Sequence, residues 1–276
     1  DKPFLKQYSR KWDLQSAPSI CQGCAVGCNI APGERYGKVK RVHNRYNDEV
    51  NGYFLCDRGR FGSGYLNSDL RLDYAGIKNP DGSFFAVHQQ QALDTAAGWM
   101  TGKKVVAIGS PRASLEANYL LRELVGPKNF APGFSDQEAD LIGGIATILQ
   151  STESINPSIK QIETADAVLI LGEDVTNTAP RVALALRQSV RNKAFELAEQ
   201  MGLPAWQDAA VRNLAQDQRS PMTIVSAMDT RLDDVASTCV SLAPDDIAAF
   251  GHAVAAALAG ETTDNAEADA AAQMLK

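Results

Sequence analysis

Four of the five cysteines lie within the first fifth of the chain, and they constrain its fold more than any other feature. Cys21, Cys24, Cys28 and Cys56 follow the spacing C-x2-C-x3-C-x27-C, whereas Cys239 stands far away. Five cysteines are too few to staple 276 residues with disulfides. In a reducing compartment, such clustering is typical of metal binding. We therefore expect three ligands to wrap one side of a metal centre and the fourth to close it from a distant loop.

The metal centre predicted from this spacing is a [4Fe-4S] cluster held by all four cysteines. The residues within Gln22–Gly27 are mostly small, so the backbone can approach a bulky inorganic core and its N–H groups can donate to sulfur. Tetrahedral zinc is an alternative, although zinc sites usually use two C-x2-C pairs. Unmetallated thiols are the third reading. Cys239 lies in the apolar run CVSL and is predicted to be a buried core thiol rather than a ligand.

Residues 1–75 predict a small, loop-rich β domain. Turn signals such as Pro32-Gly33 and Asn51-Gly52 are dense, and a strand is expected around Lys38–His43. Such a unit has little apolar core, so the metal would serve as its staple. This segment is basic, with twelve Lys or Arg against eight Asp or Glu, whereas the whole chain has a net charge of −6.

The pattern of residues 76–260 predicts an open, doubly wound α/β domain, because expected strands and helices alternate. Ala167–Gly172 is apolar throughout, as for a strand buried on both faces of a parallel sheet. Residues 261–276 are predicted to form an acidic, Ala-rich tail or linker, as a solvated helix. The other expected strands are Lys104–Gly109, Met222–Ala227 and Cys239–Ala243, and the expected helices cover Ala117–Leu124, Leu141–Leu149, Pro180–Gln200 and Asp245–Leu258.

Composition excludes several classes of protein. No run approaches eighteen apolar residues, so no membrane span is predicted. The acidic chain has no long basic run, which argues against nucleic-acid binding. No Gly-rich dinucleotide fingerprint occurs. The chain starts at Asp1 without a signal peptide, which suggests an excised fragment or a processed chain.

The residues around the cysteines carry a family resemblance. The stretches Cys28-Asn29-Ile30 and Leu55–Phe61 (LCDRGRF) resemble the N-terminal [4Fe-4S] domain of molybdopterin oxidoreductases. Asp69–Leu72 and Ala165–Gly172 resemble later parts of that family. Within it, the chain is most similar to the large iron–sulfur subunits of bacterial NADH-quinone oxidoreductase, respiratory complex I. That branch has no molybdenum cofactor.

Two departures from the catalytic members support this branch. Those members place a Cys, selenocysteine or Ser on the metal in the stretch that corresponds to about Phe130–Asp140. Here Ser135 is the only candidate, and it lacks the expected flanking Arg. After the Ala167–Gly172 strand, Glu173 and Asp174 replace a Gly-x-Asn-Pro motif, and two carboxylates would repel an anionic cofactor. No molybdopterin is therefore expected.

Three further residues require interpretation. In molybdenum relatives the Lys or Arg two positions after the last cysteine bridges cluster and pterin. Arg58 holds that position, and the interpretation favoured here is structural: it neutralises cluster charge or ties down Asp57. His43 and His88 are interpreted as surface or core residues rather than ligands.

The resemblance implies a fragment of the electron-transfer subunit of complex I, with one cluster that lies off the main electron path and is mostly structural. Electrons would pass from NADH to quinone in the assembly, and the fragment alone is not expected to be catalytic. Expected partners are other subunits of the peripheral arm, on the cytoplasmic side of the inner membrane, without direct membrane insertion. The alternatives are a fragment of a molybdopterin-dependent oxidoreductase of formate or nitrate type, or a zinc-stapled interaction module.

Overall fold

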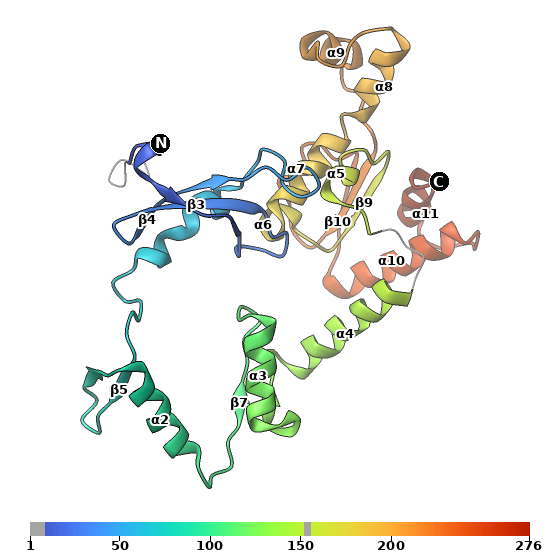
Figure 1. Ribbon diagram of the computed structural model, residues 1–276. Coiled ribbons are helices and arrows are strands. Elements are labelled where there is room, and N and C mark those ends of the chain that lie inside the picture. Colours follow the sequence, from blue (N-terminus) through green and yellow to red (C-terminus); the bar gives the residue numbers. More distant parts are fainter. Residues whose placement is uncertain (1–8, 152–155) are drawn as a thin grey trace. The chain divides into compact units, whose positions relative to one another are not determined.

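The computed structural model describes residues 9–151 and 156–276 (Figure 1). They form two compact units. The first combines the chain up to Gly64 with Pro157–Lys276, and the second covers Tyr65–Asn156. The four clustered cysteines and the C-terminal half of the chain therefore belong to one unit, although the second unit separates them in sequence.

An antiparallel sheet carries the cysteine segment. Its central strand β3 (Asn29–Arg35) pairs with β4 (Lys38–Asn44), and β1 (Gln15–Ser16) and β2 (Ser19–Ile20) also pair with β3. Positive φ angles at Tyr36 and Gly37 close the β3–β4 hairpin, as the twist of two-residue turns requires. The strand expected around Lys38–His43 is confirmed. The short helices of this region are η2 (Lys11–Asp13), α1 (Asp57–Phe61) and η3 (Gly62–Asn67).

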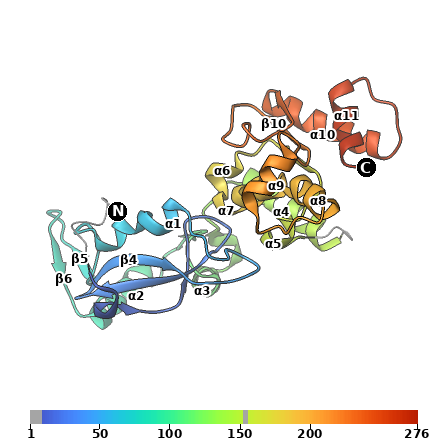
Figure 2. The ribbon, with the colours of Figure 1, turned by 90° about the horizontal axis from the view of Figure 1, so that it is seen from above.

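The C-terminal half of the first unit is built on a parallel sheet in the order β11-β10-β9. Met222 and Ile224 of the central strand pack in one apolar cluster with helix α7, and Val225 packs in another with α10 and α11. Helices thus cover both faces of the sheet, which confirms the predicted α/β class; Figure 2 shows α10 and α11 side by side. The elements are β9 (Val168–Leu171), β10 (Met222–Ser226), β11 (Thr238–Ser241), α7 (Pro180–Ser189), α10 (Pro244–Leu258) and α11 (Ala266–Met274).

The helix expected over Pro180–Gln200 is two helices. Pro180 is at the first turn of α7, as predicted, but the helix ends at Ser189 and α8 (Asn192–Gln200) begins after a break. The break lets α8 form a separate small core with α9 (Asp208–Ala215), through Ala198 and Val211. The other helices of this half are α5 (Ile159–Ile162) and α6 (Val175–Thr178).

Three expectations for this half are wrong in detail. Cys239 is exposed, because its neighbour Val240 is the residue of edge strand β11 that faces the core. Leu171 is 42% exposed, since β9 lies at the other edge and is not covered along its whole length. The predicted solvated tail contains α11, whose Ala268 and Ala271 are buried against α10. Small alanine side chains at helical spacing made that packing possible.

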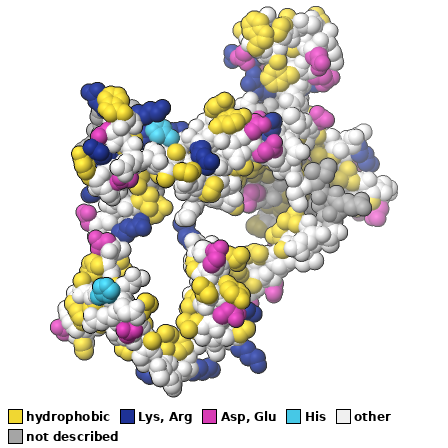
Figure 3. Space-filling view, viewed as in Figure 1, with side chains coloured by type: hydrophobic (Ala, Val, Ile, Leu, Met, Phe, Trp, Pro, Cys, Tyr) yellow, Lys and Arg dark blue, Asp and Glu magenta, His cyan; other side chains and the backbone are white. Residues whose placement is uncertain are grey.

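The second unit consists of short strands and three longer helices. A hairpin of β5 (Gly76–Lys78) and β6 (Phe84–Ala86) precedes α2 (Gln89–Met100), and β7 (Ala107–Ile108) pairs in parallel with β8 (Phe130–Ala131). The strand expected over Lys104–Gly109 is thus only two residues long. The two expected helices are confirmed as α3 (Leu115–Val125) and α4 (Asp136–Ser151), and η4 (Pro127–Asn129) follows α3. Many of their apolar side chains remain exposed (Figure 3), including Leu120 and Ile145.

Candidate iron–sulfur centre

The structure brings the four clustered cysteines to one end of the antiparallel sheet. Cys21 follows β2, Cys28 precedes β3, and the Cys21 N–H donates to the Cys28 carbonyl at 2.8 Å, which closes the loop that carries Cys24. Cys56 caps the N-terminus of α1, where its Sγ accepts from the Gly59 N–H at 3.4 Å. The Gly23 N–H similarly donates to Cys21 Sγ at 3.4 Å. These four cysteines define the candidate centre.

The pKa of Cys28 reflects its burial and the three neighbouring cysteines. Burial, together with the negative charges of Cys21, Cys24 and Cys56, raises the pKa of Cys28 to about 11. A site that gathers four thiolates needs compensating positive charge to deprotonate them, because burial and mutual repulsion both favour the neutral thiols. Ferrous or ferric iron supplies such charge, so the donor set suits a metal centre better than free thiols.

Two glycines keep space open around the sulfurs. A Cβ on Gly59 would lie 3.2 Å from Cys21 Sγ and 2.6 Å from Leu55 Cδ1, and a Cβ on Gly23 would lie 3.3 Å from Arg58 Cδ and 3.5 Å from Cys21 Sγ. Any larger residue would therefore crowd the ligand loops. This cradle of small residues fits a bulky inorganic core.

The arrangement also bears on the zinc alternative. Within residues 9–151 and 156–276, no three His, Cys, Asp or Glu side chains are arranged to hold a single metal ion. Tetrahedral zinc would draw all four sulfurs to about 2.3 Å from one point. A four-iron cluster instead binds each thiolate at its own corner and keeps the sulfurs further apart. Zinc and a four-iron cluster thus require different spacings of the four sulfurs.

Arg58 links the ligand loop to the C-terminal half of the same unit. Its Nη1 donates to the Gly23 carbonyl at 3.2 Å, and its Nη2 donates to the Asn177 carbonyl of α6 at 2.8 Å. Both contacts are with backbone oxygen, of Gly23 and Asn177 rather than of Asp57, the residue that Arg58 was expected to tie down. The guanidinium adds positive charge beside the loop that carries Cys21 and Cys24.

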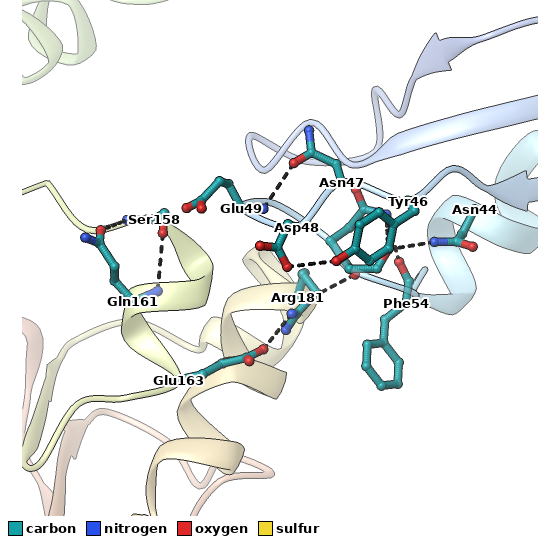
Figure 4. A network of polar contacts seen from close by, with 12 residues as sticks. Asn44, Tyr46, Asn47, Asp48, Glu49, Phe54, Ser158, Gln161, Glu163 and Arg181 are labelled. Carbon is teal, nitrogen blue, oxygen red and sulfur yellow. Dashed lines mark hydrogen bonds and ion pairs between the residues drawn. The ribbon is translucent and has the colours of Figure 1, made fainter.

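A polar network beside the candidate centre was missed by sequence reasoning (Figure 4). Asn51 is fully buried, and Arg181 of α7, which is 8% exposed, donates from Nε to the Asn51 carbonyl at 3.3 Å. Glu163 accepts from Arg181 Nη2 at 2.6 Å. Lys160 of α5 forms a further ion pair with Asp48. An Asn-Gly pair and an Arg at a helix start resemble ordinary turn and surface residues, so the sequence offered no clear signal for this network.

The residues considered for a molybdenum cofactor have other contacts. Ser135 and Glu138 form a reciprocal cap at the start of α4: the Glu138 N–H donates to Ser135 Oγ at 3.2 Å, and the Ser135 N–H donates to Glu138 Oε2 at 3.0 Å. Asp174 caps α6 by accepting from the Thr176 N–H at 3.1 Å, and Glu173 is exposed. Ser135 and Asp174 thus stabilise helix starts.

The two histidines considered in the sequence have separate environments. His88 caps α2, with its Nδ1 accepting from the Gln90 N–H at 3.3 Å. His43 lies on β4, and burial, together with Arg41, Arg60 and Lys11, lowers its pKa. The cap supports a structural role for His88, whereas His43 is partly buried and its Nε2 has no hydrogen-bond partner among the described residues.

A helix that crosses a bilayer needs about 20 predominantly apolar residues. Among the helices of the described residues, none combines the length and the apolar character needed to cross a membrane.

Comparison with known proteins extends the resemblance over almost the whole chain. The chain is 49% identical over 274 residues to a subunit of the NADH-quinone oxidoreductase of Pseudomonas fluorescens, an alignment that covers 99% of this chain and 30% of that protein. It is 49% identical over 258 residues to the protein of the same name in Pseudomonas putida, and 47% identical over 259 residues to that of Escherichia coli (strain K12). These two alignments cover 94% of this chain and 28% of each relative. The chain thus spans less than a third of the length of these relatives.

Two family models match along the chain. Residues 14–68, which include all four cysteines of the candidate centre, match the model described as "Molybdopterin oxidoreductase Fe4S4 domain". Residues 71–217 match the model described as "Molybdopterin oxidoreductase", which alone accounts for more than half of the chain. The chain belongs to the molybdopterin oxidoreductase family.

Proposed function

We propose that this chain is the part of an NADH-quinone oxidoreductase subunit that binds one [4Fe-4S] cluster through Cys21, Cys24, Cys28 and Cys56. The observation that carries the proposal is the candidate centre itself: four thiols at one end of a sheet, around a cradle that Gly23 and Gly59 keep open. The match of residues 14–68 to an Fe4S4 domain supports it. A bound cluster would supply one-electron redox chemistry.

The residues of this chain would orient and insulate the cluster. Cys28 is buried and Cys56 is fixed at the start of a helix, so these two ligands are held by secondary structure. The N–H groups of Gly23 and Gly59 donate to ligand sulfurs, which stabilises negative charge there. Arg58 adds a positive charge and fixes the first ligand loop to α6.

The proposal extends to the assembly. We infer that the complete enzyme passes electrons from NADH to quinone, with other subunits of a peripheral arm as partners on the cytoplasmic side of the inner membrane. Relatives named as a subunit of that enzyme support this inference. We place this cluster off the main electron path, as the family resemblance implies. Its role would be mostly structural, because the buried apolar side chains of residues 9–64 are those of Cys28, Ile30 and Val42.

We also propose that the α/β domain holds no molybdopterin. Glu173 is exposed at the carboxyl end of β9, and Asp174 is committed to capping α6. Carboxylates at this edge of a parallel sheet oppose the binding of an anionic pterin phosphate. The rival proposal, a molybdopterin-dependent oxidoreductase, shares the family match over residues 71–217.

Metal analysis of anaerobically purified protein tests these proposals together. We expect iron and acid-labile sulfide, without molybdenum, and a broad visible absorption that bleaches on reduction. One zinc per chain without sulfide would contradict the cluster. Molybdenum bound in stoichiometric amount to the complete subunit would favour the rival enzyme.

A further inference from the structure

Asn51 joins the backbone beside two of the four proposed ligands. The Asn29 N–H donates to Asn51 Oδ1 at 2.9 Å, and Asn29 directly follows Cys28. Asn51 Nδ2 donates to the Phe54 carbonyl at 3.3 Å, two residues before Cys56. The side chain that makes both contacts is fully buried. The Asn51 amide thus connects the start of β3, next to Cys28, with the loop that precedes Cys56. These two segments are far apart in the sequence.

Further carbonyls surround the same amide nitrogen. Asn51 Nδ2 also lies 3.2 Å from the Arg45 carbonyl and 3.3 Å from the Gly52 carbonyl. Gly52 adopts a φ of +51°, which favours glycine, and its carbonyl accepts a second bond from Asn44 Nδ2 at 2.9 Å. The loop before Cys56 is therefore held by side-chain amides in addition to backbone bonds such as that from the Gly52 N–H to the Asn47 carbonyl at 2.7 Å.

Arg181 connects this loop to the α/β domain. Besides its 3.3 Å bond to the Asn51 carbonyl, its guanidinium lies 5.6 Å from the centre of the Phe54 ring and pairs with Glu163 (Figure 4). Burying a guanidinium is unfavourable unless its contacts compensate for the lost hydration. A buried arginine is not needed for the fold of α7 alone, so the contacts of Arg181 with the Asn51–Phe54 loop require an explanation.

A second arginine, Arg58, also connects the cysteine segment with the C-terminal half of the unit. It extends from the cysteine segment, whereas Arg181 extends from the C-terminal half. Arg58 leaves α1, just after Cys56, and bonds the carbonyl of Asn177 in α6 as well as that of Gly23 in the first ligand loop. The loops on both sides of the candidate centre are therefore tied to helices α6 and α7 of the α/β domain.

We propose that Asn51 and Arg181 are positioning residues of the candidate centre. Arg181 holds the loop that Asn51 folds, and the two together set the position of Cys56 relative to Cys28. The inference rests on the proposed function, because it assumes that these cysteines hold a [4Fe-4S] cluster. The α/β domain then contributes directly to the cluster site, because its contacts with the ligand loops hold the four cysteines close together.

Release of iron to a chelator tests this inference on the full chain. Anaerobically purified wild type, Arg181→Gln and Asn51→Ala would be mixed with excess bathophenanthroline at a temperature where all three are folded by circular dichroism. The matched control is Arg187→Gln, which removes an arginine of the same helix whose partner is the exposed Asp234, at 2.7 Å. We expect iron to be released about tenfold faster from both test variants, as is typical when residues that hold metal ligands in place are replaced. The control should release iron at the wild-type rate.

The electron paramagnetic resonance spectrum of the reduced cluster provides a second readout. Displacement of Cys56 changes the g-values, whereas a contact that only stabilises domain packing lowers the unfolding temperature and leaves the spectrum unchanged. We expect changed g-values in Arg181→Gln but not in Arg187→Gln. Arg181→Lys keeps the charge but lacks the fork that places Nε on the Asn51 carbonyl and Nη2 on Glu163, so we expect it to restore less than half of the lost kinetic protection.

The outcomes separate this inference from the proposed function. Wild-type protein with iron and sulfide, together with variants that release iron at the wild-type rate and keep its spectrum, would overturn the positioning role alone. Wild-type protein without sulfide would overturn both proposals. If Arg181→Gln does not fold, Arg181→Lys and Asn51→Ala decide the question by the same two readouts.

Discussion

Gly59 lies directly against the sulfur of Cys21, so that a methyl group on Gly59 would require the sulfur to shift by a few tenths of an ångström. A Cβ on Gly59 would stand 3.2 Å from Cys21 Sγ and 2.6 Å from Leu55 Cδ1. Leu55 can rotate away, but the sulfur cannot move freely if it is a cluster ligand. Helix α1, which Cys56 caps, thus lies in close contact with the loop that begins at Cys21.

This contact predicts that Gly59→Ala weakens cluster binding although alanine favours helices. We expect the half-life of the cluster against a chelator to fall about tenfold. Gly62→Ala is the control at the end of the same helix, where a Cβ would make only an ordinary 3.7 Å contact with Arg58. Equal half-lives in the two variants would show that the close approach does not bear on the cluster.

Loss of the fourth ligand separates a structural role from electron transfer. Replacing Cys56 by Ala removes the ligand that ties the distal loop to the other three, so we expect the cluster to be lost and the cysteine domain to loosen. In the complete enzyme, assembly should fall while turnover per assembled complex stays normal. The measurement is NADH-to-quinone activity divided by assembled complex. A collapse of that ratio with intact assembly would place the cluster on the main electron path.

The acidic end of β9 predicts weak affinity for pterin cofactors. Glu173 and Asp174 stand where an anionic phosphate would have to lie, so a titration with molybdopterin guanine dinucleotide should show no saturable binding. The variant Glu173→Gly/Asp174→Asn removes both charges but also alters the α6 cap, so its folding would be checked by circular dichroism. Tight binding to the wild-type chain would contradict the proposal and favour the molybdenum enzyme.

The lowered pKa of His43 predicts that the free energy of unfolding depends on pH. Burial, together with Arg41, Arg60 and Lys11, lowers its pKa below 6.5, so the unfolded chain binds this proton more readily than the folded chain. The free energy of unfolding therefore decreases as the pH falls through the unfolded value. Between about pH 7.5 and 5.5 we expect His43→Asn to lose less stability than the wild type in denaturant titrations.

The exposed His252 provides the control for this measurement. His252→Asn should follow the wild-type pH dependence, and carboxylates contribute equally to all three proteins. Identical slopes in His43→Asn and His252→Asn would show that burial of His43 has no part in the acid sensitivity.

Much of this architecture could be predicted because its signals are local. The spacing of the first three cysteines, the turn signals around Lys38–His43 and the apolar run in β9 each depend on residues within a few positions of one another. Pro180 likewise marked the start of α7. Family resemblance then joined these segments into one fold.

Other features were beyond local reasoning. Asn51 and Arg181 are 130 positions apart, and their contact depends on how two domains pack. Cys239 was misread because an apolar run does not show which residues of an edge strand face the core; Val240 does. The alanines of α11 have the i, i+3 spacing of a packed helix, but their small side chains and acidic neighbours suggested a solvated one.

The central claim, that Cys21, Cys24, Cys28 and Cys56 hold a [4Fe-4S] cluster, is tested most directly by iron and sulfide analysis of five single cysteine-to-alanine variants. The exposed Cys239 supplies the matched control within the same chain. We predict about four iron and four sulfide per chain in the wild type and in Cys239→Ala, with loss of most of both in the other four variants. Full retention of iron and sulfide after removal of any one of the four, or one zinc per chain in the wild type, would contradict the account.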